Sequence, residues 1–256
     1  MPAPIRGPSH WAGPLPTDGT WARGRRFFAP FAGCCFLLAA PALAADPGRI
    51  DGYVTPYYNS AGPVIKVGQY SAGLASKDSS EFVATILRMK QRMRSLDFAE
   101  TYVAAIRLYD LGYRREATYW FYTAQYKGRQ FALLADQKRL GGMGDPGFEL
   151  YHAQEAFFAV VGPNINGYAF GDIGSLVAII RRVQNENESV PDLQTAYPGV
   201  NFVPRPQWQR INAGLNAGLG QLASQLVSQK SRMARERAQN GTAARFAHLT
   251  SKPFPG

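Results

Sequence analysis

Apolar residues recur at helical spacing over most of the chain, and this feature constrains the fold more than any other. The clearest run follows Asp78-Ser-Ser-Glu81, which has the form of a capping box, a side-chain acceptor answered three residues later by glutamate. The apolar positions then come at intervals of four, three, four and three residues: Phe82, Ile86, Met89, Met93 and Leu96. Such a stripe occupies one face of an α-helix. We therefore expect a mainly α fold, a helical-hairpin or bundle domain over residues 78–229.

The same spacing returns several times downstream. It predicts helices over residues 98–111, 114–126, 129–140, 148–161 and 173–183. A last long helix follows Pro206, and its apolar line is Ile211, Leu215, Leu219, Leu222 and Leu226. Glycines at 214, 218 and 220 weaken this helix but allow another helix to approach closely.

Residues 23–44 have the three parts of a secretory signal. Arg23-Gly-Arg-Arg26 supplies the positive patch, residues 27–41 form an apolar run, and Ala42-Leu-Ala44 is a small-x-small cleavage site. The apolar run is too short to cross a bilayer with ease. We expect cleavage after Ala44, removal of residues 1–44 with their irregular Pro- and Gly-rich N-terminal extension, and a periplasmic or secreted mature protein.

Other interpretations of this segment stay open. The pair Arg25-Arg26 before Phe27 resembles a twin-arginine export signal, although paired arginines are common in ordinary signals. Phe31-Ala-Gly-Cys34 resembles a lipobox that would make Cys34 a lipidated N-terminus. Against this, cleavage there would leave a second apolar run exposed. The third alternative is an uncleaved anchor, and the cleavage site at Ala44 argues against it.

The mature chain differs in composition from the whole. Residues 1–44 hold both cysteines, four of the 28 lysines and arginines, and one of the 18 acidic residues. The remaining 212 residues therefore have no cysteine and a net charge of +7, so the fold depends on packing without disulfides. We expect no nucleic-acid partner in this compartment. A basic surface there suits anionic lipid, cell-wall polymer or an acidic protein.

Residues 45–77 precede the helical pattern and are rich in glycine and tyrosine. Five glycines and Pro63 interrupt the segment, which indicates an extended arm across the helical core. The alternation in Val64-Ile-Lys-Val67 permits one short strand.

Gly112 separates two helical patterns, and the second begins with a characteristic sequence pattern. Gly112-Tyr-Arg-Arg-Glu116-Ala117 is followed by Phe121 four residues after Ala117 and by Ala124 three residues later. This resembles the core of a tetratricopeptide or Sel1-like repeat, in which small residues let two antiparallel helices approach and an aromatic fills the gap. The resemblance implies that Gly112 joins two antiparallel helices packed through Ala117 and Ala124.

The resemblance covers about residues 99–127 only. Thr101 stands near the expected large aromatic, Ala105 replaces the usual glycine, and the closing proline is absent. No second copy is visible at the family's period, whereas a solenoid needs about three. Two interpretations remain: one recognisable unit among diverged ones, or a hairpin that has converged on the same packing.

The segment after residue 140 offers the first candidates for chemistry. Gly141-Gly-Met-Gly-Asp-Pro-Gly147 is a loop, but it lacks the Lys-Ser/Thr and the preceding strand of a phosphate-binding loop. Glu149 and His152 then share a helix face, as in di-metal sites, although no second pair accompanies them. We expect no metal and no cofactor. Glu149, His152, Glu155 and Asp172 remain weak catalytic candidates.

A second loop is expected over residues 162–171. Asp172 would cap the next helix, and Tyr168 and Phe170 would either plug the core or present a recognition surface. Beyond residue 230 the chain turns basic, which predicts a solvated tail over residues 230–256 and the one segment suited to membrane contact.

Two hypotheses about function follow. The first is a non-catalytic exported protein that binds another protein of the cell envelope, as an adaptor or an immunity-type inhibitor. Its candidate contact residues are aromatic: Tyr102, Tyr109, Tyr119, Tyr122, Tyr126, Tyr168 and Phe170. The second is an envelope hydrolase that acts on a polymer through helix-borne carboxylates. Two carboxylates facing each other across a cleft would favour the enzyme.

Overall fold

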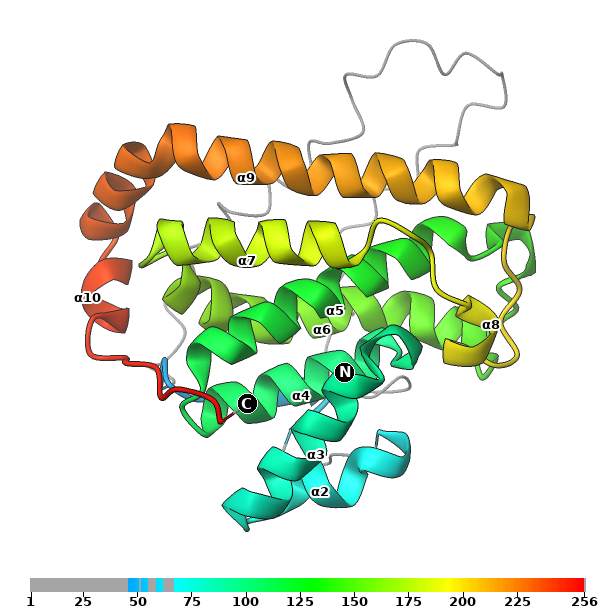
Figure 1. Ribbon diagram of the computed structural model, residues 1–256, viewed down its shortest axis with the longest axis horizontal. Helices are drawn as coiled ribbons and strands as arrows, with labels where there is room; N and C mark the ends of the chain where they lie inside the picture. The colour runs from blue at the N-terminus through cyan, green and yellow to red at the C-terminus, as the bar shows by residue number, and fades with distance from the viewer. Residues whose placement is uncertain (1–45, 51, 55–58, 62–66, 256) are drawn as a thin grey trace, which may run out of the picture. The chain divides into compact units, whose positions relative to one another are not determined.

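The computed structural model describes residues 46–50, 52–54, 59–61 and 67–255, which all belong to one compact unit spanning residues 39–256. This part of the chain is mainly α, as the apolar spacing predicts (Figure 1). The expected signal, residues 1–44, lies outside the described residues. So do much of the expected arm and residues 64–66 of the expected strand.

The region expected as an arm contains regular structure. Strands β1 (Gly52–Val54) and β2 (Asn59–Ala61) pair antiparallel. The 3-10 helix η1 (Gly68–Tyr70) and the short helix α2 (Ser71–Ala75) follow, so residues 68–75 are helical where we expect extended chain. Tyr70 and Leu74 are four residues apart and both buried, which gives this turn an apolar face despite its glycines.

Helix α3 (Ser79–Gln91) begins where the sequence predicts. The Asp78 carboxylate accepts a hydrogen bond of 2.8 Å from the Glu81 backbone N–H, and the predicted stripe is buried as far as Met89. The α-helix then ends, and the short 3-10 helix η2 (Met93–Ser95) carries the chain onward.

Helices α4 (Phe98–Asp110) and α5 (Arg114–Leu134) form the predicted hairpin around Gly112. Gly112 has φ +87°, the left-handed conformation that glycine adopts without strain. The Tyr113 N–H donates to the Leu108 carbonyl at 2.8 Å and the Gly112 N–H to Tyr109 at 3.0 Å, a Schellman cap. Ala117 and Ala124 are fully buried, as the prediction requires.

Helix α5 is the centre of the fold. It contacts α4, α6, α7 and α9, and every residue from Ala117 to Gly128 is buried (Figure 1). The helix also continues through Gly128, where the sequence pattern suggests a break. A helix that is buried on all faces must satisfy its polar side chains internally.

Helix α6 (Pro146–Ala169), which follows the short 3-10 helix η3 (Gln137–Arg139), corrects one prediction. The loop expected at residues 162–171 is helical up to Ala169, and Pro163 lies inside the helix. Val161 and Ile165 are buried on either side of this exposed proline. Burial of that apolar face outweighs the local preference of Gly162-Pro163 to end a helix.

Helix α9 (Trp208–Gln239) lies along α7 (Ile173–Glu186). Between them the chain forms α8 (Leu193–Ala196) and the 3-10 helix η4 (Arg205–Gln207). A side chain at Gly220 would meet the Gln184 amide at 2.9 Å, so this glycine permits the close approach of the two helices. Leu215, Leu219, Leu222 and Leu226 are buried as predicted.

Helix α9 continues to Gln239 and is largely exposed beyond residue 230, as expected of a solvated helical tail, but the chain does not fray after Gly241. Gly241, with φ +76°, turns it into α10 (Thr242–Phe246), and Phe246 is buried. The final segment then packs against the α4–α5 turn, where the Lys252 N–H donates to the Gly112 carbonyl at 2.9 Å and the Phe254 ring lies 5.4 Å from Tyr113. Basic side chains mark this segment as polar, but its backbone and Phe254 supply contacts that charge patterning does not reveal.

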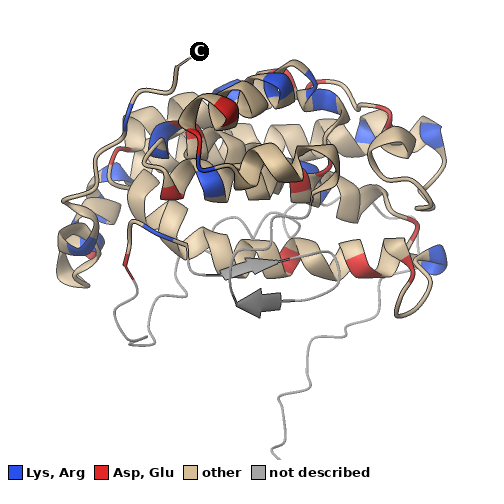
Figure 2. Cartoon of the chain, turned by 90° about the horizontal axis from the view of Figure 1, so that it is seen from below, with Lys and Arg blue, Asp and Glu red and all other residues tan. Residues whose placement is uncertain are grey.

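The described helices share two general properties. None of them is both long and apolar enough to cross a bilayer. Along the helices seen in Figure 2, basic and acidic residues are interspersed.

Candidate functional site

The carboxylate and histidine candidates on α6 do not converge. Glu149 accepts a hydrogen bond of 2.8 Å from the Gly144 N–H and so holds the glycine-rich loop. His152 and Glu155 are exposed, and the His152 ring packs beside Phe148 at 4.5 Å. Within the described residues, no three His, Cys, Asp or Glu side chains gather closely enough to hold a metal ion.

Asp172 is the N-cap of α7, as predicted. Its carboxylate accepts hydrogen bonds from the Ser175 N–H at 3.1 Å and the Ser175 hydroxyl at 2.6 Å. These hydrogen bonds, together with the charge of Arg115, hold the pKa of Asp172 below its usual range. Asp172 is therefore ionised at neutral pH, which suits a cap and does not suit a general acid.

Most of the predicted aromatic contact residues are in the core, and that part of the prediction is wrong. The five tyrosines of α4 and α5 are each at most 5% exposed: Tyr102, Tyr109, Tyr119, Tyr122 and Tyr126. Except for that of Tyr102, their hydroxyls donate to acceptors within the fold, as when Tyr122 donates to the Asn166 side chain at 3.0 Å. Burial raises the pKa of Tyr126 to about 12. A partner cannot reach these rings on the folded protein.

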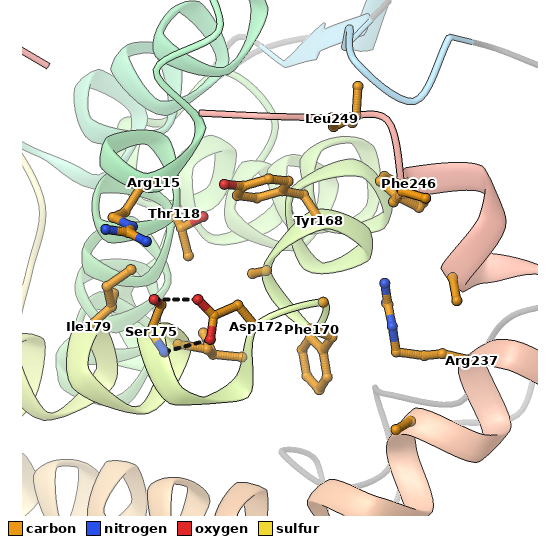
Figure 3. Close-up of a pocket in the computed structure, with 16 residues that line it drawn as sticks. Arg115, Thr118, Tyr168, Phe170, Asp172, Ser175, Ile179, Arg237, Phe246 and Leu249 are labelled. Carbon is orange, nitrogen blue, oxygen red and sulfur yellow. Dashed lines mark hydrogen bonds between the residues drawn. The ribbon is translucent and has the colours of Figure 1, made fainter. Parts of the chain in front are cut away.

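The other two aromatic candidates do meet at a cavity. Tyr168 and Phe170 are half-buried at the end of α6 and line a pocket of about 450 Å³ together with Asp172. Arg115 of α5, Arg237 of α9 and Phe246 of α10 also line this pocket. With the residues of α6 and α7, five helices contribute to the lining. Figure 3 shows the two arginines on opposite sides of this pocket, with Asp172 and Phe170 between them. We call this cavity the arginine pocket.

Two features of the backbone assemble the arginine pocket. The left-handed Gly241 ends α9 and directs α10 back towards α6. At Gly167, a Cβ atom would collide with the Phe246 ring, so glycine is needed for α10 to close this side of the pocket. The joint between α6 and α7, residues 170–172, forms the facing wall.

The two arginines of the arginine pocket differ in their electrostatic surroundings. The positive charge of Arg115 helps to lower the pKa of the Asp172 carboxyl group. Arg237 is half-buried, and among the described residues its guanidinium has no hydrogen-bond acceptor and no carboxylate partner. Burial lowers the pKa of Arg237 through desolvation. Within the described part of the chain, the charge of Arg237 in this pocket is therefore uncompensated.

Sequence reasoning missed a second group of charges at the start of α4, in which Lys127 is buried and Asp97 and Glu100 are half-buried. Asp97 and Glu100 form a reciprocal capping box beside a cavity of about 340 Å³, and the Lys127 ammonium donates to the Met93 and Leu96 carbonyls, at 2.7 Å each. Burial and the charge of Asp97 raise the pKa of Glu100 to about 7, and burial lowers that of Lys127 to about 8. Each group has a partner within the fold, which indicates a structural role. The sequence Asp97-Phe-Ala-Glu100 is the pattern from which the capping box of α4 could have been predicted.

No family model matches the sequence, and comparisons with curated proteins and with solved structures find no match either.

Proposed function

We propose that the mature chain is an exported, non-catalytic helical protein that binds another protein of the cell envelope, as an adaptor or an immunity-type inhibitor. The observation that carries the proposal is the arginine pocket, where Tyr168 and Phe170 stand half-buried at a helix joint. Half-buried aromatic side chains beside arginine are typical of the residues that dominate protein interfaces. The resemblance of residues 99–127 to a tetratricopeptide-type unit supports the same class of function.

An envelope hydrolase has less support. Its carboxylates would have to face each other, yet Glu155 lies on the first half of α6 and Asp172 lies past its end. At 1.5 Å per residue, the helix between them separates their backbones by roughly 20 Å. Inverting and retaining glycosidases hold their two carboxyl groups within about 10 Å. No observation on the described residues favours this function.

The proposed compartment is the periplasm or the exterior. It rests on the arginine patch, the apolar run and the Ala42-Leu-Ala44 cleavage site of the sequence. A mature chain without cysteine is compatible with an oxidising compartment, because it has no thiol that could form a wrong disulfide.

The test is affinity capture from an envelope extract with the full chain tagged after Gly256. Tyr168→Ala should reduce recovery of the bound protein at least about tenfold, the effect of losing one interface hot spot. Tyr151→Ala is the matched control, because Tyr151 is also a half-buried tyrosine on α6 but lies outside the pocket. Equal recovery with both variants, or capture of no protein at all, would contradict the proposal.

A further inference from the structure

We infer that the arginine pocket binds a carboxylate carried on an apolar or aromatic group, with Arg237 as its charge partner. The inference rests on the proposed function and gives the chemistry of the partner's contact: the C-terminal carboxylate of a polypeptide that ends in an apolar residue. A free aromatic acid presents the same chemistry, and the experiment below separates the two sources.

The first support is the state of Arg237. A guanidinium removed from water without a counter-charge loses solvation and gains nothing in return. Arg237 has this position in the described structure, since it is half-buried and has no acceptor. Its Nη2 lies 3.7 Å from where a Cβ atom on Gly171 would be, so the charged end reaches the wall formed by the α6–α7 joint. A carboxylate can pair with this planar fork through two parallel hydrogen bonds.

The second support is the charge balance around the pocket. The lining contains Arg115, Arg237 and one acidic residue, Asp172. Both Asp172 oxygens already accept hydrogen bonds from Ser175, and its charge is offset by Arg115. Asp172 therefore does not serve as the counter-ion of Arg237. Among the described residues that line the pocket, the excess positive charge is therefore one unit, which matches a carboxylate rather than a phosphate dianion.

The third support is the apolar part of the lining. Apolar side chains from the end of α6, from α7 and from the C-terminal segment line the same cavity: Phe170, Ile179, Phe246 and Leu249, which Figure 3 labels, and Leu176. A volume of about 450 Å³ accommodates one or two residues of a peptide and lies within the range of small-ligand pockets. The ligand should therefore place its carboxylate at Arg237 and its apolar group against these side chains.

The test is calorimetric titration of the full exported protein with matched acid and amide probes. The small pair is N-acetylphenylalanine and its neutral amide, and the peptide pair is a pentapeptide that ends in phenylalanine, with a free or an amidated C terminus. We expect the acid of each pair to bind at least about tenfold more tightly than its amide, because the charge-assisted bond is lost in the amide.

Arg237→Gln should remove that preference, whereas Arg235→Gln should keep it. Arg235 is exposed on the same helix and lies outside the pocket, so it controls for the change in net charge. Equal melting midpoints of the two variants exclude misfolding as the cause. Equal affinity for acid and amide, equal affinity of the two variants, or no binding by any probe would overturn the inference.

Two further outcomes separate this inference from the proposed function. If only N-acetylphenylalanine binds and the pentapeptide does not, the assignment of the carboxylate to a polypeptide is overturned. If capture of the envelope protein is lost with Tyr168→Ala but survives Arg237→Gln, the proposed function stands and the carboxylate inference is overturned.

Discussion

The Tyr126 hydroxyl of α5 donates a hydrogen bond of 2.7 Å to the side-chain oxygen of Asn212 on α9. Gln130 donates to the same oxygen at 2.6 Å, and the Asn212 amide group donates to the Asn187 carbonyl at 3.0 Å. Asn212 is fully buried, so these bonds connect α5, the end of α7 and α9 away from water. The tyrosines that the sequence presents as contact residues act here as polar connectors of the core.

Replacing Asn212 with alanine should therefore destabilise the protein strongly. The change leaves the Gln130 amide without the acceptor that it has in this network and removes one of the two donors to the Asn187 carbonyl, which also accepts from Tyr126. An unsatisfied buried polar group costs about 1–3 kcal/mol. We expect the free energy of unfolding in urea to fall by about 2–3 kcal/mol. Gln221→Ala, at an exposed position of the same helix, should stay within about 0.5 kcal/mol of the parent. Similar values for both variants would contradict a buried network at Asn212.

Ala117 tests the packing of the α4–α5 hairpin. Because Ala117 is fully buried where the two helices meet, Ala117→Leu inserts a branched side chain into filled space. We expect a loss of about 1–3 kcal/mol in the free energy of unfolding. Ala84→Leu is the matched control at an exposed position of α3 and should change stability little. An unchanged melting midpoint for Ala117→Leu would show that the helices do not pack through this residue.

Glu100 predicts a pH dependence of stability. Its pKa is about 7 in the folded protein against 4.5 in the unfolded chain, owing to burial and to Asp97, with Lys127 and Arg92 opposing. The folded state thus binds this proton more tightly. The contribution of Glu100 to stability is therefore fully present below pH 4.5 and is lost as the pH rises through about 7.

Glu100→Gln should flatten this fall and keep the acceptor for the Asp97 N–H. After a discount for solvent screening of this partly exposed group, we expect the variant to gain about 1 kcal/mol on the parent between pH 5 and pH 7.5. Glu81→Gln is the control, since Glu81 occupies the same third position of α3 but is exposed. Urea unfolding at both pH values measures the difference, and parallel profiles for parent and Glu100→Gln would refute the assignment.

Export predicts a defined N-terminus. Intact-mass measurement of the protein from an envelope or secreted fraction should give a chain that begins at Ala45, because cleavage follows Ala42-Leu-Ala44. Substituting Ala44 with a bulky residue such as phenylalanine should block processing. A mature protein that retains residues 27–41, or a mass that shows a lipid on Cys34, would contradict this route.

The sequence predicted those parts of the fold that are set by local chemistry. Asp78 and Asp172 cap helices as expected, and Gly112 turns the hairpin, because each effect depends on residues within one helical turn. The loop predicted over residues 162–171 is wrong as far as Ala169, since the buried neighbours that stabilise α6 come from distant segments. The tyrosines of α5 were wrongly placed on the surface, because no local pattern indicates that a helix is covered on every side.

The arginine pocket could be predicted only in part. The sequence predicts a role for Tyr168, Phe170 and Asp172, which lie within five residues of one another beside an evident turn. Arg115 and Arg237 are 122 positions apart in the numbering and meet at one cavity only because Gly241 and α10 bring the chain back. Their basic character was visible in the sequence, but their convergence depends on the tertiary fold.

Site-specific photo-crosslinking in the producing cells tests the central claim most directly. A benzophenone amino acid at Phe170 should give one discrete covalent product with an envelope protein. The same amino acid at Phe148, which is equally half-buried but lies outside the pocket at the start of α6, should give none. A product at Phe170 that disappears when free N-acetylphenylalanine is added is the predicted result. No product at Phe170, or the same product from both positions, would contradict partner binding at the arginine pocket.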